Sequence, residues 1–237
     1  MGNNQHLKRH SAPSAWSIKR KNITFVTKPN PGSYKTRYVV PVIIIIRDIL
    51  KYAETSKEVK LIIHNQEVLL NGKKVIDIKT PVGMFDILEI KEAKEKYMVL
   101  FDNFGKIKLI SVKDNLLYLK VNNKKQVKSG GYQLNFMNGF NLLVDEKVFN
   151  SVNVEDTVIF DYVKKKIEKV LPLAEKSFVY MFDGKFKGFF GEVKKFDLYN
   201  GLTKDNVQID INNVIHTTAK DYCFVVGTKK EDLKKFK

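Results

Sequence analysis

Cysteine is almost absent from this sequence: among 237 residues, only Cys223 is a cysteine. A single thiol excludes an internal disulfide, and it excludes a zinc site made from several cysteines of the chain. This usage is typical of a reducing compartment, and we expect a cytoplasmic protein.

Long apolar runs are missing as well. The most apolar stretch, YVVPVIIIIR at 38–47, falls far short of the roughly 20 residues of a membrane-spanning helix, and Pro41 interrupts it. No apolar signal-peptide core lies near the start. The sequence therefore predicts no membrane partner, and its hydrophobic content of 43% predicts a globular chain.

Acidic residues are missing from positions 1–47, which hold nine lysines and arginines. The chain as a whole has a formal net charge of +16, and all of its arginines lie in this stretch: Arg9, Arg20, Arg37 and Arg47. Because arginine binds phosphate in a two-pronged way and stacks on bases, this placement favours close contact with a polyanion, most commonly a nucleic acid.

Residues 1–40 contain three prolines and have weak periodicity. They predict a basic arm with little regular structure, disordered when free and ordered on RNA. A disordered tail or an organelle transit peptide would have a similar composition. The single tryptophan, Trp16, either packs against the body of the protein or stacks on RNA. We expect loss of residues 1–22 to weaken RNA binding and to leave the β domains folded.

Residues 41–64 are the only segment with a convincing helical pattern. Pro41 suits the first turn of one helix. Thr55 and Glu58 have the spacing of a capping box at the start of a second helix. The apolar stripe of that second helix has the i, i+3, i+4 spacing and consists of Val59, Ile62 and Ile63.

A β-hairpin is predicted directly after these helices, with Asn71-Gly72 as a turn of the I′ type. Solvent-facing cations are expected on both elements: Lys57, Lys60 and His64 on the helix, and Lys73 and Lys74 on the hairpin. Cations on the helix and on the neighbouring hairpin could contact an RNA backbone from two sides. A solvated helix face is the simpler alternative for the lysines.

Beyond residue 84, short runs rich in β-branched and aromatic residues follow one another, from MFDILEI to CFVVG. Turn signals separate them, at Asn103-Phe104-Gly105, Asn138-Gly139, Asp183-Gly184 and Asn200-Gly201. This pattern predicts small β barrels, with a boundary near Pro172. We predict an α+β, mainly β fold in four parts: a basic arm at 1–40, a helix–helix–hairpin RNA-binding module at 41–92, a central β domain at 93–171, and a β barrel with a short tail at 172–237.

Two local resemblances support this division. TSKEVKLIIHNQEVLLNGKKV resembles the small RNA-binding domain shared by small-subunit ribosomal protein four, pseudouridine synthases and some aminoacyl-tRNA synthetases, although Gln66 stands where that motif usually has glycine. FDGKFKGFFGEVKKF resembles a KOW motif, whose glycines permit a tight basic loop. Its expected phosphate contacts are Lys185, Lys187, Lys194 and Lys195. An ordinary hairpin is the alternative for this second segment.

Nearly the whole chain resembles the archaeal and eukaryotic-type small-subunit ribosomal protein four, the "e" type. The matching strings include HLKRHSAPSAW, KPNPG, TPVGMFDIL, GGYQLNFMNGFNLLV and VEDTVIFDYVKKKIEKVLPL, in that order. The resemblance implies a family-specific central domain, a KOW barrel and an arm that threads into ribosomal RNA. It also implies a structural protein of the small ribosomal subunit whose partners are small-subunit rRNA and neighbouring ribosomal proteins, and not a small molecule or a second copy of the chain.

The RNA-binding residues expected from the charges and the resemblance are His6, Lys8, Arg9, His10, Trp16, Lys19, Arg20, Lys21, Lys28, Arg37, Arg47, Lys57, Lys60, His64, Lys73, Lys74, Lys185 and Lys187. No metal, cofactor or catalytic residue is expected, because no convergent set of catalytic groups is recognisable. His6 and His10 have a metal-like spacing, but no nearby cysteine or carboxylate completes a site. The alternatives are a KOW-bearing translation or transcription factor, or an rRNA-modifying enzyme, either of which would bind the subunit transiently.

Overall fold

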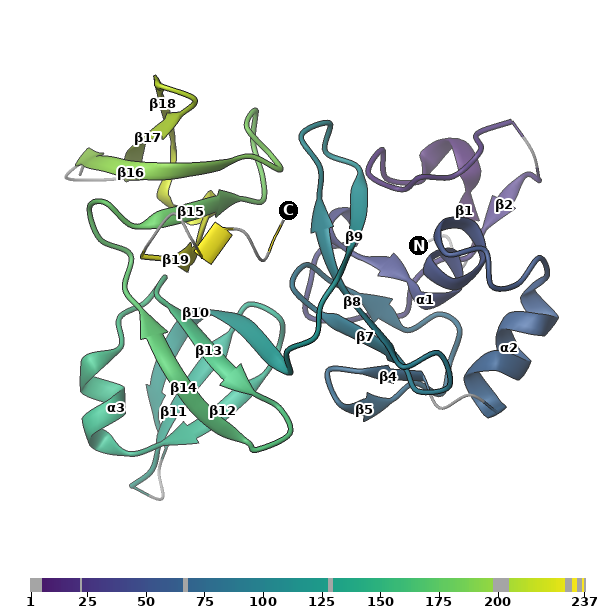
Figure 1. Ribbon diagram of the computed structural model, residues 1–237, viewed down its shortest axis with the longest axis horizontal. Helices are drawn as coiled ribbons and strands as arrows, with labels where there is room; N and C mark the ends of the chain where they lie inside the picture. The colour runs from purple at the N-terminus through teal and green to yellow at the C-terminus, as the bar shows by residue number, and fades with distance from the viewer. Residues whose placement is uncertain are drawn as a thin grey trace, which may run out of the picture. The chain divides into compact units, whose positions relative to one another are not determined.

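The protein consists mainly of antiparallel strands with a few short helices (Figure 1), which confirms the predicted class. In the computed structural model of the chain, the described residues are 6–21, 23–65, 68–127, 130–197, 205–228, 232–233 and 236. Gln66 and the Asn200-Gly201 turn lie outside them. The chain forms two compact units, one of residues 1–101 and 105–114, the other of residues 102–104 and 115–237.

The first unit contains three sheets, two of them with only two strands. The strands at the start of the chain are β1 (Leu7–Lys8), β2 (Phe25–Val26), β3 (Val40–Pro41) and β6 (Pro81–Val82), which pair as β1–β2 and β3–β6. The main sheet has the order β5-β4-β7-β8-β9, formed by β4 (Val68–Leu70), β5 (Lys73–Lys74), β7 (Ile87–Ile90), β8 (Glu95–Phe101) and β9 (Ile107–Ser111). The boundary predicted between 92 and 93 falls inside this sheet, because β8 pairs along β7.

The longer helical elements of the first unit lie where the periodicity predicts them: α1 (Val42–Ile44), its π-helical continuation η3 (Ile45–Ile49), and α2 (Ser56–Asn65). The sequence did not predict the short helices η1 (Arg9–Ser11) and η2 (Thr36–Tyr38), which lie in the segment expected to be an arm. The five residues from Val42 to Ile46 are fully buried, so the most apolar run of the sequence forms the core of this unit. Because this run is buried, it supplies apolar core area that the many charged residues of the chain cannot supply.

The first part of the predicted arm has little regular structure, as expected, but it packs onto the body of the unit. Trp16 is 1% exposed, and its indole Nε1 donates a hydrogen bond of 2.7 Å to the carbonyl oxygen of Val39. The amide of Ile107 bonds to the carbonyl of Ala15 at 2.9 Å, which fixes the same segment to the start of β9. A buried indole with a satisfied N–H is a core residue, so Trp16 does not stack on RNA. Loss of residues 1–22 would therefore also remove part of the core.

A buried carboxylate holds the β4–β5 hairpin in place. Asp86, which is 6% exposed, accepts hydrogen bonds from the Asn71 side chain at 2.8 Å and from the Gly83 amide at 2.7 Å. The side-chain oxygen of Asn71, Oδ1, accepts a hydrogen bond of 2.8 Å from the backbone amide of Ile87. Asn71 and Gly72 have φ of 51° and 78°, as a type I′ turn requires, so this predicted turn is confirmed.

The second unit contains two five-stranded antiparallel sheets. The first has the order β12-β11-β10-β13-β14, formed by β10 (Leu116–Gln126), β11 (Tyr132–Phe136), β12 (Asn141–Val144), β13 (Thr157–Asp161) and β14 (Lys166–Leu171). The second has the order β18-β17-β16-β15-β19, formed by β15 (Phe178–Met181), β16 (Phe190–Asp197), β17 (Asn206–Ile211), β18 (Val214–Ala219) and β19 (Cys223–Gly227). Pro172 lies between the two sheets. The KOW barrel stays a prediction.

Three described elements of this unit are absent from the sequence prediction: the short helices α3 (Glu146–Ser151) and η4 (Lys220–Tyr222), and strand β18. A buried lysine links the two sheets, because Lys120 on β10 donates to the carbonyl oxygens of Asp221 at 2.8 Å and Cys223 at 2.7 Å. Burial lowers the pKa of Lys120, and the nearby Glu155 carboxylate opposes that shift.

The burial of Trp16 is directly testable, because it is the only tryptophan. We expect its fluorescence in the free protein to be blue-shifted and poorly quenched by acrylamide, and to change little when RNA is added. Trp16→Ala should destabilise the protein by about 3–5 kcal/mol in urea unfolding followed by circular dichroism. Phe25→Ala, at a half-exposed ring of the same segment, is the matched control and should cost less than about 1 kcal/mol. A strongly quenched tryptophan in the free protein would contradict the packed segment.

Asp86 should give stability a specific pH dependence. Burial raises the pKa of Asp86 to about 6 from its usual value of 3.8, against the hydrogen bonds from Asn71 and Gly83, which lower it. Since the folded pKa exceeds the unfolded one, the contribution is fully present below pH 4 and is lost as the pH rises through 6. We expect the difference in unfolding free energy between wild type and Asp86→Asn to change by roughly 2 kcal/mol between pH 4 and pH 7. A difference independent of pH would refute this assignment.

Candidate nucleic-acid interface

Helix α2 starts with the capping box that the sequence predicts. The Glu58 amide donates to Thr55 Oγ1 at 3.3 Å, and the Glu58 carboxylate accepts from the amides of Thr55 at 3.3 Å and Glu54 at 2.8 Å. These bonds lower the pKa of Glu58. Val59 and Ile63 are buried and Ile62 is half-buried, so the predicted stripe packs α2 onto the unit and leaves its other faces in solvent.

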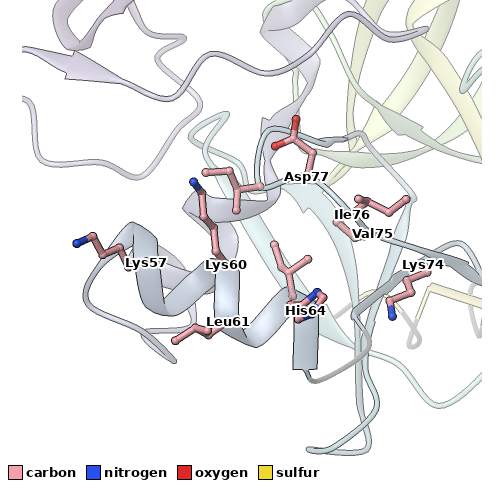
Figure 2. A pocket seen from close by; sticks show the side chains of 10 residues that line it. Lys57, Lys60, Leu61, His64, Lys74, Val75, Ile76 and Asp77 are labelled. Carbon is pink, nitrogen blue, oxygen red and sulfur yellow. The ribbon is translucent and has the colours of Figure 1, made fainter.

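A groove of about 880 Å³ runs between α2 and the segment that begins at β5. Figure 2 shows the helical residues along one side and the residues from Lys74 to Asp77 along the other. The groove is lined by Lys57, Lys60, Leu61, Ile63, His64, Lys74, Val75, Ile76, Asp77 and Ile78. Four of the predicted RNA-binding residues therefore come together here, and two separate elements of the chain provide them.

Positive charge dominates the rim of this groove. The side chains of Lys57, Lys60 and Lys74 are exposed, and His64 is exposed beside them. Among the described residues of the lining, the one carboxylate is Asp77, which is exposed and accepts hydrogen bonds from the Lys79 amide at 3.0 Å and the Asn30 side chain at 2.8 Å. The pKa of Asp77 is lowered first by the Lys79 hydrogen bond, then by Asn30 and by nearby positive charge that includes Lys60. The groove thus presents cations and exposed apolar surface to a ligand.

Lys73 is exposed on β5 but does not line the groove. Among the lining residues, the sequence reasoning missed Leu61 and Ile76. Leu61 lies outside the apolar stripe of α2, and Ile76 lies between Val75 and Asp77 in a run of mixed character, so no local signal marks either residue as exposed.

Two arginines of the predicted arm hold its own fold together. Arg9 is buried, and its guanidinium donates to the carbonyl oxygens of Ile23 at 2.9 Å and Lys19 at 3.0 Å. Arg20 is half-buried and donates to four carbonyl oxygens between Arg9 and Pro13. Arginine can satisfy many carbonyls at once through its five N–H groups. Arg9 is thus used inside the protein, where its guanidinium is bonded to the backbone.

The other predicted residues at the start of the chain are accessible. Those with exposed side chains are His6, Lys8, His10, Lys19, Lys21, Lys28 and Arg37. Arg47 is half-buried and forms an ion pair of 2.8 Å with Asp48. A second groove, of about 500 Å³, brings Arg9, Lys19 and Arg47 together with Lys51, which the sequence reasoning missed.

The predicted KOW loop lies between β15 and β16 in the second unit. Gly184 and Gly188 have φ of 82° and 89°, a conformation that suits glycine. Lys185 is exposed, Lys187 is half-buried, and the ring of Phe186 stacks 4.3 Å from His216. Of the two further lysines expected there, Lys195 is exposed. Lys194 is engaged in ion pairs with Glu192 at 3.2 Å and Asp210 at 3.6 Å, which leaves it less available to phosphate.

Within the described residues, no group of three or more His, Cys, Asp or Glu side chains is arranged to hold a metal ion. The His6 ring lies 5.3 Å from the ring of Phe25. In the same part of the chain, no helix is long and apolar enough to cross a membrane.

Two family models match the sequence. The one described as the RS4NT (NUC023) domain matches residues 1–37, and the one described as ribosomal family S4e matches residues 93–167. The first covers the folded N-terminal segment, and the second begins just before β8 and ends within β14.

Archaeal proteins and a solved structure are similar along most of the chain. The small ribosomal subunit protein eS4 of Methanocaldococcus jannaschii is 33% identical over 242 residues, which cover 98% of each chain. The protein of that name from Archaeoglobus fulgidus is 32% identical over 96% of this chain and 95% of its own. The crystal structure of the 30S ribosomal protein S4e from Thermoplasma acidophilum has a TM-score of 0.67 at 26% identity, covering 81% of this chain and 97% of that one.

The lysines of the first groove should determine how strongly binding to RNA depends on salt. We expect the triple change of Lys57, Lys60 and Lys74 to Gln to reduce the slope of log K against log salt by about 2–3, since each lost phosphate contact removes nearly one released counterion. The matched control is the same change at Lys165, Lys166 and Lys169, which removes equal charge from exposed positions of the second unit. Filter binding to rRNA at several salt concentrations measures both. Equal slopes for the two variants would show that the groove has no special role.

Proposed function

The chain belongs to the S4e family of ribosomal proteins, and from this membership we propose that it is a structural constituent of the small ribosomal subunit that binds and stabilises small-subunit rRNA. The observation that supports this most strongly is its similarity, over 95% or more of its length, to several archaeal proteins named small ribosomal subunit protein eS4. Its role is in translation, on cytoplasmic ribosomes, with neighbouring proteins of the small subunit as its other partners.

The mechanism we propose is neutralisation of RNA phosphates combined with recognition of RNA shape. Lysines on α2 and on the β4–β5 hairpin flank one groove, so a single RNA backbone could be held from two sides. The exposed cations of the N-terminal segment and the loop between β15 and β16 provide further contacts. A protein that contacts RNA through several such surfaces can fix RNA helices relative to one another during assembly.

The folded N-terminal segment changes how the arm is proposed to act. Since Arg9, Trp16 and Arg20 are used within the protein, the segment presents its exposed cations on a preformed surface. Binding by a preformed surface avoids the entropy loss that ordering a disordered arm would impose. The proposed contacts from this segment are Lys8, His10, Lys19, Lys21 and Lys28, all of which are exposed.

Sedimentation of a native extract through a density gradient in high salt tests the proposal. High salt removes proteins held only by weak electrostatic attraction and leaves integral components in place. We expect the protein to remain with the small subunit in near-equal amount to its rRNA. If it moves to the top of the gradient, it is a transient factor or a modifying enzyme. A known integral protein of the small subunit, probed in the same fractions, controls for dissociation of the particle.

A further inference from the structure

Two large aliphatic side chains are exposed in the lysine-rimmed groove. Leu61 on α2 is 60% exposed, and Ile76, just after β5, is 88% exposed. Below them, Ile63 and Val75 are buried and continue the apolar lining. Single exposed aliphatic residues are common on protein surfaces, but these two line one groove of about 880 Å³ together with the exposed imidazole of His64. That volume falls within the range of sites that bind small organic groups, about 300–1,000 Å³.

The chemistry of this groove does not suit an RNA backbone alone. Phosphates laid against Leu61 and Ile76 would lose hydration without a hydrogen bond in return, which is unfavourable. In a continuous duplex the faces of the bases are covered by stacking, so only backbone and groove edges reach a protein surface. The apolar lining therefore requires a ligand that also offers an apolar surface.

The rim of the groove argues against a protein segment as the occupant. Lys57, Lys60 and Lys74 line the groove together with the apolar residues, while the one carboxylate among the described lining residues, Asp77, is already bonded to Asn30 and the Lys79 amide. An apolar peptide would leave these lysines without compensating charge unless it were also strongly acidic. A nucleotide combines the two required properties, since its base has an apolar face and its phosphate is an anion.

We propose that this groove receives an unpaired nucleotide of RNA, with its base against Ile76 and His64 and its flanking phosphates beside the lysines of the rim. The imidazole of His64 can stack on a base, and the aliphatic side chains of Leu61 and Ile76 contact the rest of its surface. The inference rests on the proposed RNA-binding function and adds a specific ligand: a bulged or looped nucleotide in place of a plain helix.

The lining also determines what the groove discriminates. Leu61, Ile63, Val75 and Ile76 have no side-chain groups that could form hydrogen bonds with base edges. Contact with the face of a base is tolerant of sequence, because every base has such a face. The groove therefore distinguishes an unpaired nucleotide from a paired one more strongly than it distinguishes one base from another.

The test uses the full-length protein and two RNA hairpins that are identical except for one bulged 2-aminopurine nucleotide in the stem. We expect wild type to bind the bulged RNA more tightly, and binding to change the fluorescence of the 2-aminopurine. Ile76→Ser and His64→Ala should each reduce this preference at least about fivefold, the lower end of the effect of losing one base contact. Both side chains are exposed, so folding should be retained, which circular dichroism checks.

Ile215→Ser is the matched control, because Ile215 on β18 is also an exposed aliphatic residue, at 62%, and lies outside the groove. It should leave the preference unchanged. If Ile76→Ser and His64→Ala bind both RNAs with wild-type preference, the inference is wrong while the proposed function stands. If wild type binds neither RNA, the proposed function itself fails and the inference fails with it.

A crosslinking experiment in assembled small subunits distinguishes RNA from protein as the occupant. A photoreactive residue in place of Ile76 should crosslink to an unpaired nucleotide of rRNA, which sequencing of the crosslinked RNA identifies. A crosslink only to another protein, or only to paired nucleotides, would overturn the proposal. The same residue in place of Ile215 reports on background labelling.

Discussion

One buried carboxylate determines the geometry on which the candidate interface depends. Asp86 accepts bonds from the Asn71 side chain and the Gly83 amide, and Asn71 in turn accepts from Ile87. Together these bonds fix the β4–β5 hairpin against the sheet, with Lys74 at the position where it faces α2 across the groove. Burial raises the pKa of this carboxyl, and the hydrogen bonds from Asn71 and Gly83 oppose that shift by stabilising the ionised form in place.

Arginine and lysine have different structural roles within the N-terminal segment. Arg9 and Arg20 satisfy backbone carbonyls and hold the segment in a fixed shape, while Lys8, Lys19 and Lys21 extend into solvent. An arginine has five N–H groups in a fixed arrangement, whereas a lysine is a compact, strongly hydrated charge. A segment rich in both can thus build a fold from one and an electrostatic surface from the other. High positive charge alone did not reveal this difference.

Regular patterns in the sequence predicted most elements correctly, and they failed where stability depends on distant contacts. The short runs predicted beyond residue 84, from MFDILEI to CFVVG, correspond to strands, and the Asn71-Gly72 turn and the Thr55–Glu58 capping box are as expected. Strand β18 is mostly exposed, so it lacks the buried apolar residues that mark a strand. Only the structure shows that Trp16 belongs to the core, where it donates a hydrogen bond to the carbonyl of Val39, 23 residues further along the chain. No local pattern indicates such a contact.

For the candidate site, the sequence by itself determined which charges are available, and the tertiary structure decided which of them act together. Lys57, Lys60 and His64 follow from helical spacing, because a helix presents residues to solvent with a fixed period. Their meeting with Lys74, and the exposure of Ile76 between them, depend on how the chain returns from the hairpin to the sheet. The residue types of a segment determine its charge and the spacing of the positions that face solvent. Packing between residues far apart in sequence sets which side chains face the same groove, because it is the buried contacts that fix the direction of each element.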